Sequence, residues 1–97
     1  MSAHTPGPWK VDFKKFNQVK AENGALIAEC RTLNGMVNLQ ANARLIAAAP
    51  ELLEMLKKFV AYENAMEAND DVLGMTLYFE CSELARVAIA KATEVQA

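Results

Sequence analysis

The hydrophobic residues of this chain change their spacing once, near residue 38, and this change constrains the fold more than any other feature. In residues 9–16, aromatic and aliphatic side chains alternate with lysine and aspartate, which is the period of a strand covered on one face. After residue 38, apolar residues recur every three or four positions, as in an amphipathic helix. A chain of 97 residues has room for one domain. The sequence therefore predicts a single α+β domain over residues 1–97, with strands first and helices after.

The Asn23-Gly24 pair indicates a tight turn inside the strand region. Asn-Gly readily adopts the positive φ angles that short antiparallel hairpins require. Pro6 and Pro8 favour an N-terminal loop over residues 1–8. We expect a three-stranded antiparallel meander within residues 9–31. Its predicted strands are residues 9–16, 18–22 and 25–31.

Three helices are expected in the helical part, residues 38–95. Asn38 is suited to an N-cap. Pro50 disfavours helical geometry in the residue before it and suits the first turn of a new helix, so the first apolar run becomes two helices that meet at a bend. The last helix is apolar on two sides, which predicts contact with the second helix or another subunit, and hence a homodimer or higher homo-oligomer. The predicted helices are residues 39–48, 50–66 and 72–95.

The charge distribution excludes a general attraction to nucleic acid or to an anionic membrane. The net charge is −2. Residues 1–50 carry six cations and three acids, a net of +3, and residues 51–97 carry four cations and nine acids, a net of −5. No signal peptide or apolar run long enough to span a bilayer is evident, so we expect a cytoplasmic protein without membrane contact.

Catalytic and metal-binding patterns do not stand out. The single histidine, His4, lies in the proline-rich tail, and there is no Gly-rich phosphate loop, serine elbow or cluster of metal ligands. Cys30 and Cys81 form no CxxC motif, which favours two free thiols in a reducing compartment, with a disulfide left open. We expect a protein that is not an enzyme and holds neither a cofactor nor a metal.

Arg44 is the residue that most invites a binding role, because it lies in an otherwise apolar helix and needs a partner. One interpretation is an internal ion pair with Glu22, Glu29 or an acid near the C-terminus. The other is a pocket at a subunit interface for an anionic ligand such as a cyclic nucleotide. The candidate residues of that pocket are His4, Trp9, Asn42 and Arg44.

Two further groups of side chains have alternative interpretations. Aromatic residues interleave with lysines in residues 9–16, which is typical of single-strand nucleic-acid binding, but alternation along a strand favours covered aromatics and solvated lysines. Trp9 is accordingly expected to anchor the N-terminal loop to the core. A second group could form a patch for a host protein, or could lie in the core. Its members are Phe59, Tyr62, Met66 and Tyr78, with Met75 beside them.

Two strings carry a resemblance to a known group. HTPGPW at residues 4–9 and ANARLIAAAPELLEML at residues 41–56, with ARVAIAKA at residues 85–92, resemble small proteins of tailed bacteriophages and prophages. The resemblance covers most of the chain and brings no catalytic residue with it. It implies a phage accessory protein that binds a host component, a host protein or a small anionic nucleotide-like ligand, with counter-defence as the specific expectation. The alternative is a nucleic-acid-associated accessory protein of phage replication or recombination.

Overall fold

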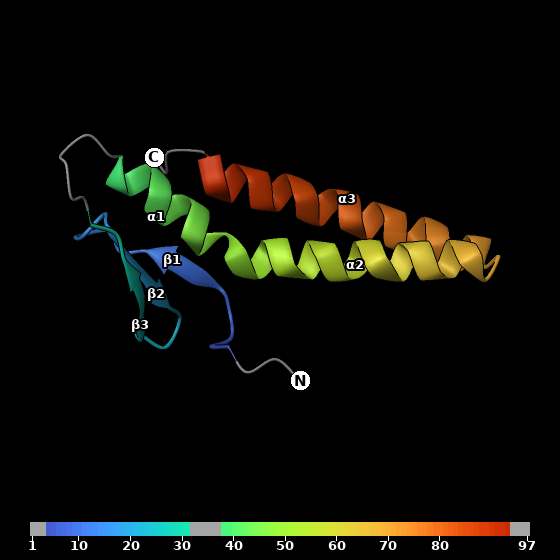
Figure 1. Cartoon of the computed structure of the whole chain (residues 1–97), viewed down its shortest axis with the longest axis horizontal. Helices are drawn as coiled ribbons and strands as arrows, with labels where there is room; N and C mark the ends of the chain where they lie inside the picture. The colour runs from blue at the N-terminus through green and yellow to red at the C-terminus, as the bar shows by residue number, and fades with distance from the viewer. Residues whose placement is uncertain (1–3, 32–37, 94–97) are drawn as a thin grey trace.

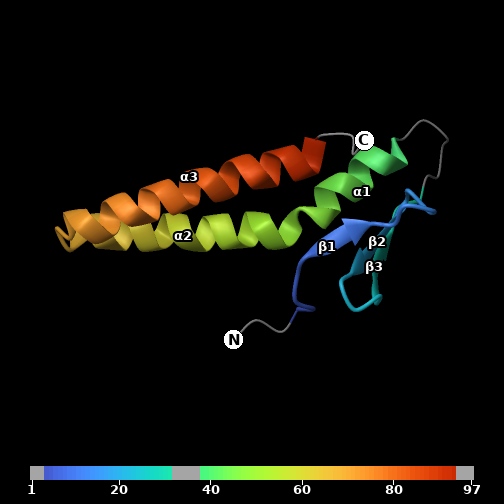
Figure 2. The ribbon, with the colours of Figure 1, turned by 180° about the vertical axis from the view of Figure 1, so that it is seen from behind.

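The structure is a computed structural model that describes residues 4–31 and 38–93. A three-stranded sheet lies against α1, and α2 and α3 run side by side as a long hairpin away from the sheet (Figures 1 and 2). The Cα extents are 52 × 26 × 26 Å. This arrangement confirms the predicted α+β class. The elements are β1 (Trp9–Val11), β2 (Gln18–Ala21), β3 (Leu26–Glu29), α1 (Leu39–Ala47), α2 (Ala49–Glu67) and α3 (Asp71–Thr93).

The sheet is the expected antiparallel meander in the order β1-β2-β3. Trp9 pairs with Ala21 and Val11 with Val19, while a register irregularity follows Val19 in the β2–β3 ladder. The turn between β2 and β3 places Gly24 at φ +89°, as the Asn-Gly signal predicts. The Asn23 side chain accepts a hydrogen bond from the Ala25 amide at 3.0 Å and fixes the turn.

The predicted first strand is too long, and its two phenylalanines are not covered. β1 ends at Val11, and Phe13 and Phe16 are 77% and 54% exposed. The cause is the register: the Asp12 amide bonds to the Gln18 carbonyl, so residues 13–17 must reverse the chain and have no strand to pair with. The alternation of the sequence therefore stops two residues before Phe13.

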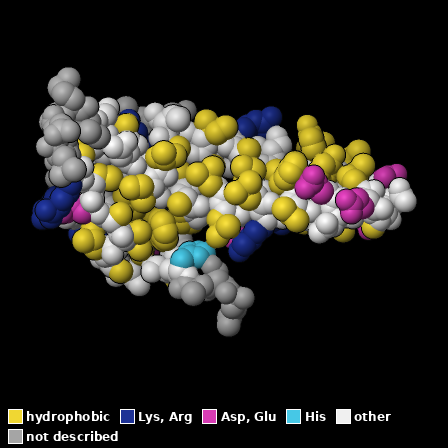
Figure 3. Space-filling model, viewed as in Figure 1, with side chains coloured by type: hydrophobic (Ala, Val, Ile, Leu, Met, Phe, Trp, Pro, Cys, Tyr) yellow, Lys and Arg dark blue, Asp and Glu magenta, His cyan; other side chains and the backbone are white. Residues whose placement is uncertain are grey.

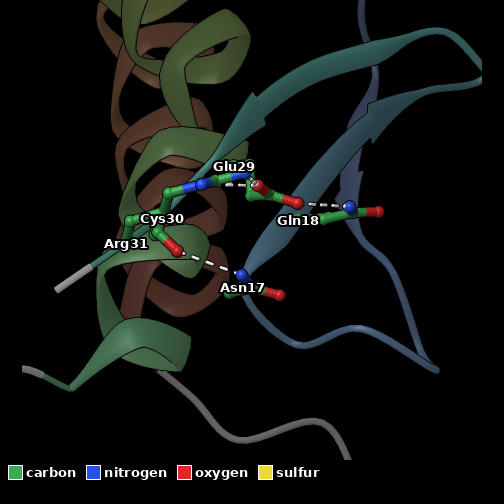
Figure 4. Close-up of polar contacts among 5 residues, drawn as sticks. All are labelled: Asn17, Gln18, Glu29, Cys30 and Arg31. Atoms are coloured by element: carbon green, nitrogen blue, oxygen red, sulfur yellow. Dashed lines mark hydrogen bonds and ion pairs between the residues drawn. The ribbon is translucent and has the colours of Figure 1, made fainter.

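A polar cluster joins the far ends of β2 and β3 (Figure 4). Glu29 accepts hydrogen bonds from the Gln18 side chain at 2.7 Å and from Arg31 Nε at 2.8 Å. The Gln18 hydrogen bond, followed by the hydrogen bond and charge of Arg31, lowers the pKa of Glu29 from its ordinary 4.5. The Asn17 side chain donates to the Cys30 carbonyl at 3.0 Å and closes the cluster.

The helices begin and end close to the predicted positions. Asn38 caps α1 by accepting from the Ala41 amide at 2.8 Å, and Pro50 lies in the first turn of α2. After the last residue of α2, Asn69 adopts a positive φ of 57°, and the Asp70 amide donates to the Ala65 carbonyl. This is the Schellman motif that commonly terminates helices. The predicted exit loop at 32–37 and the last residues of the third helix, 94–95, lie outside the described residues. No helix in the described ranges is long and apolar enough to cross a membrane.

The core is small and lies between the sheet and α1. Val19, Ala43 and Ala47 are fully buried at its centre, with Trp9 and Ile46 among the residues packed against them. The indole of Trp9 donates to the Thr5 carbonyl at 3.1 Å, so it ties the N-terminal loop to this core. Along the hairpin, the buried residues are mainly small: Ala65, Gly74, Leu77 and Ala88.

Candidate functional site

A cavity of about 780 Å³ lies where the loop after β1, α1 and the end of α3 meet. This volume is within the range of pockets that hold small organic ligands. Gln40, Arg44 and Ala47 line it from α1. These residues lie four and three positions apart, so the helix presents them on one face. We call it the Arg44 cavity.

Arg44 is partly buried, and two of its guanidinium nitrogens are fully buried. Neither Nε nor Nη1 has a hydrogen-bond partner among the described residues. The proposed internal ion pair with Glu29 is absent, because Arg31 and Gln18 occupy that carboxylate, and the exposed Glu22 makes no ion pair in the described part of the chain. The third proposed partner was an acid near the C-terminus, where Glu94 lies outside the described residues. A buried donor without an acceptor costs free energy, so these nitrogens are set up for an acceptor that enters the cavity.

The cavity wall is cationic. Lys10 and Lys91 line it with Arg44, and Asp12 is the acid among the lining residues. Asp12 is engaged by Lys20 at 3.7 Å, and Lys91 is held by Glu51 at 2.5 Å. Lys10 and Arg44 therefore carry the positive charge that no neighbour offsets in the described residues. An anionic group in the cavity would face both of them.

Aromatic rings lie beside these cations. Phe13 and Phe16 line the cavity and are largely exposed to solvent. The ammonium group of Lys14 lies 5.6 Å from the ring centroid of Phe13. Exposed rings next to positive charge provide stacking surfaces for a planar anionic molecule.

The four sequence-predicted pocket residues do not come together. Arg44 lines the large cavity, whereas Asn42 is exposed two positions earlier on α1 and points to a different side of that helix. His4 and Trp9 contact each other, with ring centroids 6.3 Å apart, but neither is among the residues that line the Arg44 cavity. Trp9 packs against the core instead.

The two strings that carry the phage resemblance contact each other. A Cβ on Gly7 would lie 2.7 Å from the Cβ of Pro50, so the loop can approach the start of α2 this closely only with glycine there. His4 and Leu84 are among the residues that line a second, shallower hollow of about 490 Å³ at this contact. The strings therefore describe a structural junction that fixes the sheet against the helices.

The predicted helical patch is exposed and continuous. Phe59, Met66 and Tyr78 are 45%, 45% and 55% exposed, and Met75 is 64% exposed. Tyr62 is half-buried, and its ring centroid lies 6.0 Å from that of Tyr78, so the rings connect α2 to α3. These side chains lie on the outside of the hairpin rather than in a core.

The sequence did not identify Lys10, Phe13, Phe16 or Lys91 as neighbours of Arg44 in the cavity. The alternation of Phe13 and Phe16 with lysines was a sequence signal for a binding surface. No sequence pattern indicated Lys91, because only the antiparallel packing of α3 brings it to the Arg44 cavity. Residues 4–31 and 38–93 contain no group of three or more histidine, cysteine or acidic residues placed to hold a metal ion, and both cysteines are free thiols.

Comparison with known proteins places the chain in one family. No curated protein and no solved structure matches it. A family model described as Salmonella phage P22 protein Y8K6 matches residues 1–96, nearly the whole chain. With the junction of its two characteristic strings and the α+β fold in view, the chain belongs to the Salmonella phage P22 protein Y8K6 family.

Proposed function

We propose that this phage protein is a non-catalytic binding protein that takes a nucleotide-like host molecule into the Arg44 cavity and sequesters it. The observation that carries the proposal is the pair of buried Arg44 nitrogens, Nε and Nη1, without a partner in the described residues. A guanidinium presents two parallel donors that match a phosphate, and such charge-assisted hydrogen bonds are about twice as strong as neutral ones. A phosphate would therefore satisfy both nitrogens at once.

The rest of the cavity suits the remaining parts of a nucleotide. Lys10 adds a second cation for a further phosphate oxygen, and Phe13 and Phe16 offer faces on which a base can stack. Base stacking on aromatic rings contributes about 1–3 kcal/mol per base. A phosphate at Arg44 and a base on the rings explain why exposed aromatics lie beside a buried cation.

The biological direction comes from the family. The family is one of phage proteins, and a phage protein that binds a host nucleotide without converting it would lower the free concentration of that molecule. Nucleotide signals of antiviral defence are the host molecules for which sequestration benefits a phage. We therefore assign a counter-defence role in the bacterial cytoplasm.

Isothermal titration of the purified protein tests this assignment. The probes are a cyclic dinucleotide, a nucleoside monophosphate and inorganic phosphate. We expect the cyclic dinucleotide to bind and the Arg44→Met and Phe13→Ala variants to lose at least tenfold in affinity. Arg86→Met is the matched control, because Arg86 is an exposed arginine on α3 that pairs with Glu83 at 3.9 Å. Absence of binding by every nucleotide probe, or unchanged affinity in Arg44→Met, contradicts the proposal.

A single-stranded nucleic acid is the second candidate. It is favoured by the exposed positions of Phe13 and Phe16 beside Lys10 and Lys14, because these form stacking faces along a basic track. A short oligothymidylate titrated at several salt concentrations separates the two ligands. Oligonucleotide affinity above that of the cyclic dinucleotide, with a steep salt dependence from several released counterions, identifies the nucleic acid.

A further inference from the structure

The α2–α3 hairpin has a long apolar face whose large side chains are half exposed. Six large side chains define this surface, which we call the hairpin face, and each is between 45% and 64% exposed. Spacings of three and seven residues on α2, and of three and eleven on α3, align them along each helix, and the contacts Phe59–Tyr62 and Tyr62–Tyr78 join the two rows. In the view of Figure 3, hydrophobic side chains gather over the hairpin and the sheet, and acidic side chains gather at the tip of the hairpin. The six residues are Leu56, Phe59, Met66, Met75, Tyr78 and Ile89.

The sheet and the N-terminal loop contact other sides of the two helices. The loop meets Pro50, Lys57 and Leu84 around the second hollow, and the Arg44 cavity reaches Val87. Lys57 and Val87 are each two positions from a member of the hairpin face, which turns them about 200° around the helix. The hairpin face is therefore on the side that the sheet does not cover.

We infer that a second copy of this chain covers the hairpin face, so that two hairpins pack face to face as a four-helix bundle. The available area matches this occupant. Six half-exposed side chains of roughly 150–200 Å² each supply about 500 Å² of apolar surface. A standard interface buries about 800 Å² per partner, of which about 65% is apolar in homodimers, or about 520 Å². One copy of the same face meets that requirement without another surface.

The charges fix the orientation of the two copies. The tip of the hairpin carries Glu63, Glu67, Asp70 and Asp71, and no lysine or arginine occurs from residue 59 to residue 79. Two hairpins packed in parallel would bring the two acidic tips together. Antiparallel packing keeps the two acidic tips apart, one at each end of the bundle. Like charges repel across an interface, so the copies are antiparallel.

Light scattering on a size-exclusion column tests the second copy, independently of any ligand in the Arg44 cavity. We expect twice the 10.6 kDa mass of one chain at micromolar concentration. Met75→Lys should shift the protein to one chain, while Leu73→Lys should leave the dimer intact, because Leu73 is 47% exposed but lies outside the hairpin face. A mass other than two chains for the parent, or equal effects of the two variants, overturns the inference.

Cross-linking tests the same interface without a charge on the apolar face. Ser82 is the middle member of the row 75, 78, 82, 85 and 89, so antiparallel packing brings two copies of it together near the two-fold axis. Ser82→Cys should form a disulfide-linked dimer under mild oxidation, while Asp71→Cys at the tip and the parent chain should not. A linked dimer of Asp71→Cys, or none of Ser82→Cys, overturns the antiparallel bundle.

Discussion

Replacing Arg44 by methionine should make the free protein more stable and, at the same time, unable to bind its ligand. The two effects have opposite signs because Nε and Nη1 are buried without acceptors in the described chain. An arginine that served the fold through an internal ion pair would lower stability when removed. The direction of the change therefore separates a binding role from a structural one.

The magnitude follows from the two nitrogens. Each buried, unsatisfied donor costs about 1–3 kcal/mol, so the pair costs about 2–6 kcal/mol in the free protein. Methionine keeps an unbranched apolar stem, and such near-isosteric replacements lose less than about 1.5 kcal/mol of packing. The expected net gain is about 0.5–4.5 kcal/mol. In a domain of this size, each 1 kcal/mol raises the melting temperature by about 4–8 °C.

Urea unfolding followed by circular dichroism measures this gain. Lys10→Met is the control, since Lys10 lines the same cavity but is exposed, and its free energy of unfolding should stay within about 0.5 kcal/mol of that of the parent. A saturating nucleotide should raise the midpoint of the parent and leave that of Arg44→Met unchanged. A loss of stability in ligand-free Arg44→Met would refute the reasoning.

Three further substitutions test the sheet. Trp9→Ala should lower the free energy of unfolding by about 3–5 kcal/mol and Trp9→Phe by less, measured by urea unfolding, because the indole joins the N-terminal loop to the core; a loss below about 1 kcal/mol contradicts the anchor. The hydrogen bonds from Gln18 and Arg31 lower the pKa of Glu29 in the folded state. The ionised carboxylate therefore contributes fully to the free energy of unfolding above pH 4.5, and this contribution is lost as the pH falls through the lower pKa of the folded state. Above that pH, the parent should therefore unfold at a higher urea concentration than Glu29→Gln, and this difference should shrink on acidification. A difference that does not depend on pH contradicts this role of the Glu29 carboxylate. Gly24→Ala should lower the free energy of unfolding by about 1–2 kcal/mol, because φ is +89° at that position. Thermal unfolding measures this loss, and an unchanged melting temperature would contradict the positive φ at residue 24.

The parts of the fold that depend on neighbouring residues could be predicted from the sequence. The turn at Gly24, the cap at Asn38 and the break at Pro50 each follow from the chemistry of one or two side chains, and all three are present. The three helices agree with their predicted limits to within two residues wherever the structure describes them.

The parts that depend on distant pairing could not be predicted. The length of β1 depends on where β2 begins, so the alternation through Phe13 gave the wrong side for that ring. Arg44 was recognised as a cation in need of a partner, but its cavity is completed by Lys91 from the other end of the helical part. Periodicity predicts on which face of its own helix a residue lies, but it does not predict which loop or helix packs against that face.

The small residues buried in the α2–α3 hairpin bear on the proposed association with a second copy. Ala65 and Ala88 are buried between or beside α2 and α3, and a Cβ on Gly74 would lie 2.9 Å from the sulfur of Met66, so the helices approach closely through small side chains. Small side chains remove little apolar area from water, at about 0.8 kcal/mol for each buried methylene group, whereas the six large side chains of the hairpin face are 45–64% exposed. The apolar surface of these six side chains is therefore removed from water only when a second surface covers the hairpin face. In the proposed dimer, folding of the hairpin and association of the two copies are consequently one coupled equilibrium that depends on protein concentration.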